Sequence, residues 1–499
     1  MAQIAEKEKA APAVETQQEE GSLFDKMVEE GIRTPDEKQR QNAVDVIGDL
    51  IEKVLEGEIV ISRDFEASIN AEIGKLDVLL SKQLNEIMHA PEFQKLEGSW
   101  RGLHYLVHQT ETGEMMKIRV LNISKKDLVK DMEKAVEFDQ SATFKKVYEE
   151  EFGQFGGFPY GALIGDYEFG DQPQDIALLE KISNVAAAAH APFISAAHPA
   201  LFNLESYTEL GAPRDLAKIF DNRNDAKYVK WRSFRETEDS RYVGLTLPHI
   251  LTREPYGKET VPVEAFDFEE DVTGKDHSKY LWSNAAYAFG TRLTDAFAKY
   301  SWCAAIRGVE GGGMVEGLPV HSFRTDDGEV ALKCPTETAI TDRREKELAD
   351  LGFIPLVHCK GTDYAAFFGA QSTNKPKKYD TDAANANARL SAQLQYMMAT
   401  ARFAHYLKSM MRDKIGSFAT GKNVQDFLNR WISNYVLLDD NAGQEAKAKK
   451  PLREARIDVT EDPSKPGVYK AVAFLKPHFQ LDELTVSLRL VADLPQPAK

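Results

Sequence analysis

Apolar residues recur at steps of three and four positions along the first part of the chain, and this spacing predicts amphipathic helices. The clearest case is residues 64–89, whose apolar stripe consists of Phe65, Ile69, Ile73, Leu76, Leu79, Leu80, Leu84 and Ile87. A second stripe predicts a helix over residues 37–56. A shorter helix is predicted over Leu23–Ile32, because Ser22 is a good N-cap and Pro35 follows the segment.

From residue 91 to residue 375, short apolar runs alternate with helical spacing, which predicts strands interleaved with helices. The predicted strands are Met116–Ile123, Tyr160–Tyr167, Pro192–Ala197 (a strand or a buried loop) and Phe353–Cys359. The predicted helices are Lys125–Phe138, Ile176–Ala189 and a large part of Asp276–Arg307. This alternation predicts a mixed α/β core.

The pattern then returns to helices and ends in strands. Helices are predicted over Asp382–Ile415 and Val424–Leu437, and strands over Val468–Lys476 and Leu484–Ala492. In the last strand, one face carries Leu484, Val486, Leu488 and Leu490, and the opposite face carries Thr485, Ser487 and Arg489. A strand so near the C-terminus is free to pair with another molecule, since exposed strand edges pair with foreign strands. We therefore expect a building block of an assembly.

These patterns divide the chain into five predicted regions. They are a disordered tail (1–22), an N-terminal helical region (23–90), an α/β core (91–375), a helical segment with a linker (376–450) and a C-terminal β region (451–499). The predicted fold class is therefore α/β, or mixed α+β, in several domains.

Composition and charge exclude some classes of function. The chain has 499 residues, is 42% hydrophobic and carries a formal net charge of −17, so a nucleic-acid partner is not expected. The basic strip over residues 447–456 is either a solvated linker or a contact for an acidic partner surface. Three scattered cysteines indicate a reducing cytoplasm, and we see neither a signal peptide nor an apolar run long enough to span a membrane.

Three patterns resemble chemical sites without completing one. Residues 416–422 have the spacing of a phosphate-binding P-loop, but Asn423 replaces the Ser or Thr that would hold Mg²⁺, and a helix is predicted where a strand should precede. His104 and His108 have a metal-ligand spacing without a third ligand.

The third pattern is an acidic cluster of Glu236, Glu238 and Asp239 among Arg232, Arg235 and Arg241, which favours an ion-pair network over acid–base chemistry. We expect no catalytic residue, no cofactor and no metal.

Several segments together resemble one family. They are Leu96-Glu-Gly-Ser-Trp-Arg-Gly-Leu103, Pro159-Tyr-Gly-Ala-Leu-Ile-Gly-Asp-Tyr167, Ala189-His-Ala-Pro-Phe-Ile-Ser195, Lys230-Trp-Arg-Ser-Phe-Arg-Glu-Thr-Glu-Asp-Ser-Arg-Tyr242, Tyr280-Leu-Trp-Ser-Asn284, Arg292-Leu-Thr-Asp-Ala-Phe-Ala-Lys-Tyr300 and Pro477-His-Phe479. In this order they resemble the large subunit of the type VI secretion contractile sheath, the TssC/VipB family, from about Leu23 to Leu494.

The resemblance implies a structural protein of the bacterial cytoplasm. It implies an obligate heterodimer with a small TssB/VipA-like subunit, self-assembly into a helical sheath around an Hcp inner tube, and attachment to a baseplate. It also implies that a ClpV-type AAA+ ATPase recognises the helix Leu23–Ile32, through Leu23, Phe24, Met27, Val28 and Ile32, and that Leu484–Ala492 lies in a sheet shared between chains.

Two alternatives stay open. One is a phage-type contractile tail sheath protein, which is generally built from one type of subunit, so that dependence on a small partner chain separates the two. The other is a cytoplasmic nucleotide-binding enzyme that uses residues 416–422.

Overall fold

A computed structural model describes residues 65–480, apart from 222–224, 275, 326, 416, 418–419 and 462–467, together with positions 38, 39, 41, 42, 44–46, 48 and 49. The chain forms two compact units: residues 1–82 with 264–268, and residues 83–263 with 269–499. The predicted long helix over residues 64–89 is confirmed as α3 (Phe65–Met88).

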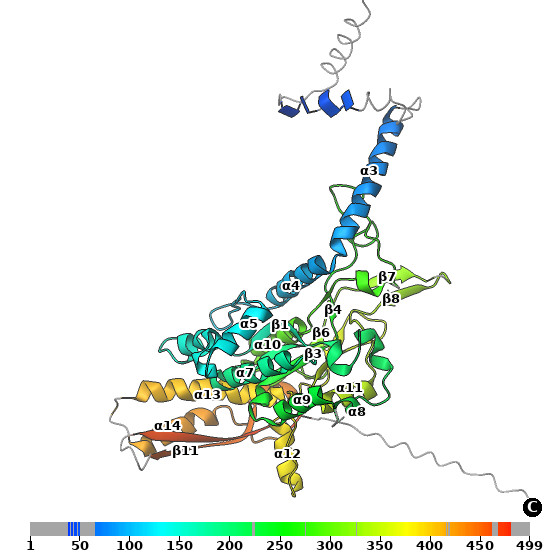
Figure 1. The fold of residues 1–499 in the computed structure, drawn as a ribbon. Helices are drawn as coiled ribbons and strands as arrows, with labels where there is room; N and C mark the ends of the chain where they lie inside the picture. Colours follow the sequence, from blue (N-terminus) through cyan, green and yellow to red (C-terminus); the bar gives the residue numbers. More distant parts are fainter. Residues whose placement is uncertain are drawn as a thin grey trace, which may run out of the picture. The chain divides into compact units, whose positions relative to one another are not determined.

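The elements after α3 alternate between helices and short strands, as the sequence predicts for the core (Figure 1). The α-helices are α4 (Pro91–His108), α5 (Lys125–Lys134), α6 (Ala142–Phe144), α7 (Pro173–Ala189), α8 (Ala217–Phe220), α9 (Ala226–Glu236), α10 (Ala286–Tyr300), α11 (Asp342–Asp350), α12 (Asp382–Leu390), α13 (Leu394–Lys414), α14 (Gly421–Ser433) and α15 (Gln444–Lys449). A π-helix, Lys145–Phe152, and short 3-10 turns at Phe138–Gln140, Pro199–Phe202, Tyr207–Gly211, Asp239–Tyr242 and His277–Lys279 complete the helical elements.

The strands form one six-stranded sheet and three hairpin-like pairs. The six-stranded sheet has the order β1 (Leu163–Phe169), β2 (Phe193–Ala197), β3 (Val243–Leu247), β9 (Ile354–His358), β10 (Ala365–Phe367) and β6 (Met314–Val315). The pairs are β4 (Ile250–Leu251) with β5 (Trp282–Ser283), β7 (His321–Arg324) with β8 (Val330–Lys333), and β11 (Leu452–Glu461) with β12 (Tyr469–Pro477). The first four strands of the large sheet are parallel, and β10 runs antiparallel to both of its neighbours, β9 and β6, so the predicted mixed α/β class is confirmed.

A hydrophobic cluster covers each face of the six-stranded sheet. Phe193 belongs to the cluster that also contains α7 residues and the large aromatics Trp231 and Phe353. Its neighbour Ile194 belongs to the other cluster, which contains residues of α10. Successive side chains of a strand point to opposite faces, so β2 and β3 are buried at every position rather than at every second one.

Two glycines bring α4 close to the elements beneath it. A Cβ atom at Gly98 would lie 2.9 Å from the Trp282 carbonyl oxygen, and one at Gly102 would lie 2.4 Å from the Tyr287 ring. The four-residue spacing places both glycines on one face of the helix. The segment Leu96–Leu103, which carries part of the family resemblance, is therefore a packing site for α4 on β5 and α10.

Two predicted helices differ from the structure because the backbone pairs elsewhere. The predicted helix Asp382–Ile415 is two helices, since residues 391–393 leave the helix to bond with the chain at residues 370–372; the Ser372 N–H donates to the Ala392 carbonyl at 2.8 Å. In Asp276–Arg307 the first part forms β5, and only α10 is a regular helix, which ends at Ser301 with a φ of 65°.

The predicted linker over residues 447–456 is also wrong. It contains the end of α15 and the start of β11. Four of its cations form local ion pairs or hydrogen bonds, namely Lys447, Lys449, Arg453 and Arg456. Arg453 lies 2.6 Å from Asp440, and the Lys447 ammonium donates to the Asp440 carbonyl at 2.6 Å. These contacts give no support to the acidic-partner alternative for this strip.

Candidate assembly site

The residues that the sequence predicts to bind partners lie outside the described residues. They are Leu23, Phe24, Met27, Val28 and Ile32 near the N-terminus, and Leu484, Val486, Leu488 and Leu490 near the C-terminus. Their roles stay predictions. The structure does describe the hairpin β11–β12, which precedes the second set along the chain.

The outer edge of β11 is closed by two side chains of α14. The Asn429 side chain accepts a hydrogen bond from the Ile457 N–H at 2.9 Å and donates one to the Ile457 carbonyl at 2.7 Å. The Gln425 side chain accepts from the Val459 N–H at 3.0 Å. Gln425 and Asn429 lie one helical turn apart, so both reach the same strand edge. The Ile457 N–H and C=O and the Val459 N–H are therefore not free to pair with a further strand at this edge.

The outer edge of β12 is open in the part of the chain that the structure describes. Because Ile457 directs its N–H and C=O toward α14, its directly opposite partner Ala473 must direct its own backbone groups away from β11. The same argument applies to Ala471, which is opposite Val459. The edge through Ala471 and Ala473 is thus the place where another strand can extend this sheet.

The hairpin buries one face and exposes the other. Ile457 is fully buried in a cluster with Leu428 and Ile432 of α14. On the opposite face, Phe474 is 52% exposed and its ring lies 4.8 Å from the Arg456 guanidinium. An apolar ring exposed beside an open strand edge is typical of a surface that another chain covers.

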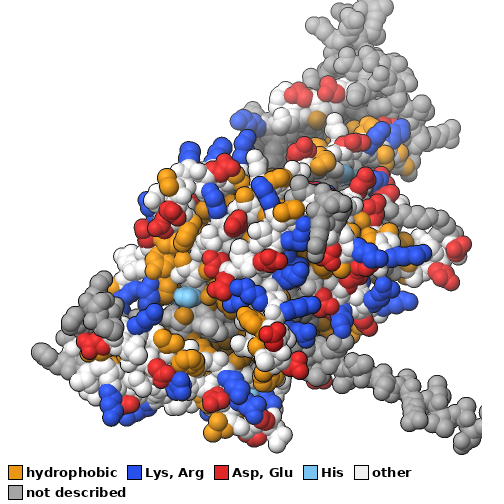
Figure 2. All heavy atoms as spheres, turned by 60° about the horizontal axis from the view of Figure 1, so that its bottom comes forward, with side chains coloured by type: hydrophobic (Ala, Val, Ile, Leu, Met, Phe, Trp, Pro, Cys, Tyr) orange, Lys and Arg blue, Asp and Glu red, His pale blue; other side chains and the backbone are white. Residues whose placement is uncertain are grey.

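Charged side chains of both signs are interspersed over the face shown in Figure 2, with apolar side chains between them. The large negative net charge is therefore not gathered into a single acidic area on this face.

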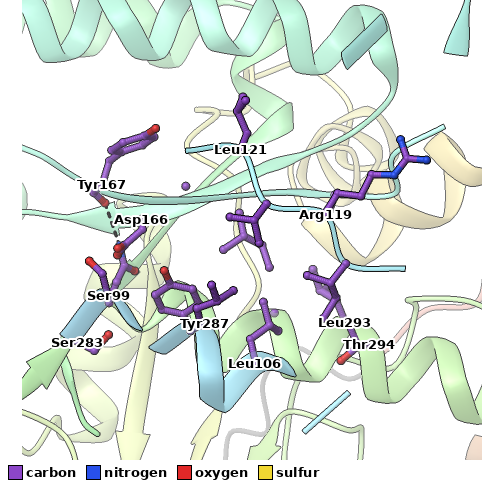
Figure 3. Close-up of a pocket in the computed structure, with 18 of the residues that line it drawn as sticks. Ser99, Leu106, Arg119, Leu121, Asp166, Tyr167, Ser283, Tyr287, Leu293 and Thr294 are labelled. Atoms are coloured by element: carbon purple, nitrogen blue, oxygen red, sulfur yellow. Dashed lines mark hydrogen bonds between the residues drawn. The ribbon is translucent and has the colours of Figure 1, made fainter. Parts of the chain in front are cut away.

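A large hollow lies in the core beside β1. Its cavity volume is about 1720 Å³, and it is lined by α4, residues 114–125, β1 and α10. Figure 3 shows Leu106 and Tyr287 among the residues that line it. This hollow is the second candidate surface for a partner.

A charged cluster lies at one end of this hollow. His249 hydrogen-bonds through Nε2 to Glu168 at 3.0 Å and through Nδ1 to Glu337, and His277 lies 3.3 Å from Glu337. Burial alone would lower the pKa of His249, but the two carboxylates outweigh burial and raise its pKa to about 10. Burial would raise the pKa of Glu337, yet His249 and His277 hold that pKa well below its usual range.

This cluster joins the end of β1, which carries Glu168, to the segments that carry His249, His277 and Glu337, and it was not predicted from the sequence. No local spacing signals this cluster, because its members lie far apart in the sequence. The smallest separation is 28 positions, from His249 to His277, and the largest is 169 positions, from Glu168 to Glu337. The edge-closing pair Gln425 and Asn429 was also missed, although two polar residues four positions apart on an apolar face were a usable signal.

Neither residues 416–422 nor the pair His104 and His108 forms the chemical site that its sequence pattern resembles. Residues 416–422 connect two helices, because α13 ends at Lys414 and α14 begins at Gly421, so the strand that a P-loop requires is not there. The His104 and His108 rings stack with their centroids 3.7 Å apart, and among the described residues no group of His, Cys, Asp and Glu has an arrangement that could hold a metal ion.

The predicted ion-pair network around Glu236 is wrong in its main contacts. The Arg235 guanidinium is buried and donates to the Thr373 carbonyl at 2.8 Å, and Arg232 donates to the Phe220 carbonyl at 2.6 Å. Glu238 is exposed and lies 4.0 Å from Lys377. Arg235 and Arg232 thus each donate to a backbone carbonyl.

Within the described ranges, no helix is both long enough and apolar enough to cross a lipid bilayer.

Comparison with known proteins gives matches along most of the chain. Residues 70–374 match the VipB family model, described as the EvpB tail sheath N-terminal domain, and residues 383–494 match the VipB_2 model, described as the tail sheath gpW/gp25-like domain. A type VI secretion system sheath protein, TssC1 of Pseudomonas aeruginosa, is 52% identical over 484 residues, which cover 96% of this chain and 97% of that protein.

Solved structures of other contractile systems are more distant. The baseplate of the anti-feeding prophage has a TM-score of 0.35 at 9% identity, covering 64% of this chain and 66% of that chain. The contracted sheath of the extracellular injection system PVC has a TM-score of 0.35 at 6% identity, covering 62% of this chain and 68% of that chain. Structural similarity at these TM-scores supports no conclusion about the present chain.

Proposed function

The chain belongs to the VipB tail sheath family, and from this premise we propose that it pairs with a small TssB/VipA-like subunit to build the contractile sheath of a bacterial type VI secretion system. The family is structural, so the chain is a sheath subunit and not an enzyme. In this proposal the heterodimers polymerise in the cytoplasm around an Hcp inner tube, and contraction on a baseplate drives that tube outward.

The observation that carries the assembly proposal is the asymmetry of the hairpin β11–β12. Its β11 edge is closed by Asn429 and Gln425, while its β12 edge has free backbone groups at Ala471 and Ala473. A strand from a neighbouring chain, with the pattern of Leu484–Ala492, would complete this sheet. Because each chain offers an edge at one place and donates a strand at another, the contact is head-to-tail, and such a contact generates a helix when its rotation does not close into a ring.

The N-terminal segment Leu23–Ile32 is proposed as the handle for a ClpV-type ATPase. Its apolar face of Leu23, Phe24, Met27, Val28 and Ile32 lies on the N-terminal side of the long helix α3 in sequence. A short amphipathic helix at such a position suits capture in an apolar groove.

Co-expression with the small subunit tests the proposal. Negative-stain electron microscopy should show long hollow tubes when both chains are present and no tubes when either chain is expressed alone. A chain that stays monomeric and indifferent to the small subunit would overturn the heterodimer. Tubes formed by this chain alone would instead indicate the one-component, phage-type sheath.

A further inference from the structure

Residues 116–123 are the one predicted strand of the core that has no strand partner in the described part of the chain. The segment is extended between α4 and α5 but belongs to no sheet. Within the described residues, no backbone N–H or C=O of residues 117–122 makes a hydrogen bond. Extended backbone without partners is rare unless water or another chain satisfies it.

The neighbouring strand β1 also has an unpaired edge. The Leu163 N–H donates to the Pro192 carbonyl at 2.8 Å, and the Ser195 hydroxyl donates to the Gly165 carbonyl at 2.9 Å, so these residues face β2. Residues alternate in direction along a strand, so Ile164 and Asp166 direct their backbone groups to the opposite side. As the first strand in the sheet order, β1 has no strand on that side within the described chain.

Side chains, rather than a backbone ladder, join these two free edges. At one end the Tyr167 hydroxyl donates to the Ile123 carbonyl at 2.7 Å, and the Lys125 ammonium donates to the Glu168 carbonyl at 2.6 Å. At the other end the Lys117 ammonium lies 3.9 Å from the centre of the Phe158 ring. The long side chains of Tyr and Lys span a distance that a direct backbone hydrogen bond could not.

The hollow described above lies along this pair of edges. Its lining includes residues 114–125 on one side and Ile164 and Asp166 of β1 on the other. Figure 3 shows Leu106 of α4 and Leu293 of α10 reaching toward the extended segment, whereas Arg119 projects away from it. The space is thus bordered by free backbone groups and lined with apolar side chains.

We propose that a β-strand of the small sheath subunit enters this hollow and pairs with residues 117–122 and with the outer edge of β1. The inference rests on the proposed heterodimer and deepens it by locating the contact. Unpaired backbone on both borders fits a strand, because a helix has no free backbone groups to offer along its length. The incoming strand should be apolar at alternate positions, to cover exposed apolar side chains of the lining such as Leu121.

Residue-resolved hydrogen–deuterium exchange, on the full chain alone and on the co-expressed complex, tests this inference. In the free chain the amides of residues 117–122 should exchange rapidly, because none is hydrogen-bonded. In the complex every second amide of this segment should slow, on the order of 100-fold or more, since a strand paired along one edge protects alternate N–H groups. A docked helix would not give this period-two protection.

A pair of proline variants gives a second readout. Neither the Val120 N–H nor the Leu121 N–H is hydrogen-bonded in the described chain, so Val120→Pro and Leu121→Pro should unfold at the same urea concentration as the wild type. Neighbouring amides of a strand point to opposite sides, so at least one variant should lose the small subunit on purification, by 10-fold or more. The matched variants Val120→Ala and Leu121→Ala should retain it.

The outcomes separate the inference from the function on which it rests. If no complex forms with the wild-type chain, the proposed heterodimer fails. If the complex forms while residues 117–122 exchange as fast as in the free chain, or while both proline variants bind normally, strand insertion is wrong and the heterodimer stands. If the amides of residues 117–122 are already protected in the dilute free chain, the hollow is occupied by residues 481–499 of this chain. If their protection grows with the concentration of the free chain, the hollow is occupied by a second copy. Either result overturns the proposal.

Discussion

The middle strands of the six-stranded sheet are buried on both faces and paired on both edges, whereas the hairpin β11–β12 is buried on one face and paired on one edge. Every residue of β2 and β3 is buried, while β12 alternates between exposed and half-buried residues. A strand buried all round is complete within its own chain. Among the described residues β12 keeps a free edge and an exposed face, and this is where we propose that another chain pairs to build the sheath.

The largest effect on folding is expected from the aromatic core. Trp231 is almost fully buried and its ring stacks on Phe353 with centroids 5.9 Å apart. Trp231→Ala should lower the free energy of unfolding by ~3–5 kcal/mol, because the lost side chain leaves a cavity. Urea unfolding of the chain measures this loss. The control Phe474→Ala removes a half-exposed aromatic of β12 and should change stability by no more than ~0.5 kcal/mol.

The next effect concerns the charged cluster that joins loops at the end of the core sheet. The pKa of His249 is raised from 6.5 to about 10 in the folded chain, so its contribution to stability is full below pH 6.5 and is lost as pH rises toward 10. Urea unfolding at pH 6.5 and pH 9.5 should show a larger loss for the wild type than for His249→Gln. Equal losses in the two proteins would mean that His249 is not held in its charged form.

Adjacent residues of the hairpin should respond differently to proline. Val472 is opposite Asp458 in a hydrogen-bonded pair, so Val472→Pro removes a ladder bond and should cost ~2 kcal/mol of unfolding free energy. Ala473 directs its N–H to the free edge, so Ala473→Pro should fold normally and yet fail to form tubes with the small subunit. Equal effects of the two variants on urea unfolding would contradict the assignment of the open edge.

Leu488→Asp should leave folding unchanged and abolish tubes. Leu488 belongs to the predicted donated strand, and an aspartate there would place an unpaired charge in the shared sheet. Electron microscopy of the co-expressed pair measures tube formation, and circular dichroism of the heterodimer checks the fold. Thr485→Asp, on the opposite face of the same strand, is the matched control. Normal tubes from Leu488→Asp would exclude this strand from the shared sheet.

The smallest effect on structure is expected at the N-terminus. Phe24→Asp should leave tube formation intact, because Phe24 is predicted to belong to the helix that the ATPase recognises. The rate at which a ClpV-type ATPase disassembles contracted tubes should fall, as followed by light scattering. Disassembly at the wild-type rate would show that this helix is not the recognised handle.

The sequence by itself determined the elements whose pattern is local. The spacing of apolar residues predicted α3 to within one residue at each end, residues 192–197 were predicted as a strand or a buried loop and form β2, and several short segments in order pointed to the family that the whole-chain comparison established. Helical and strand periodicities are properties of neighbouring residues, so they are visible without a fold.

Only the tertiary structure decided which backbone groups are paired. The break at residues 391–393 arises because distant residues 370–372 take those hydrogen bonds, and the closed edge of β11 depends on two side chains from α14. The predicted strand 116–123 is wrong for the described chain, because the segment lies in no strand and pairs with no other strand there. Strand pairing is a contact between residues far apart in sequence or in another chain, so periodicity shows that a segment can form a strand, and only the tertiary structure shows whether it pairs and with what.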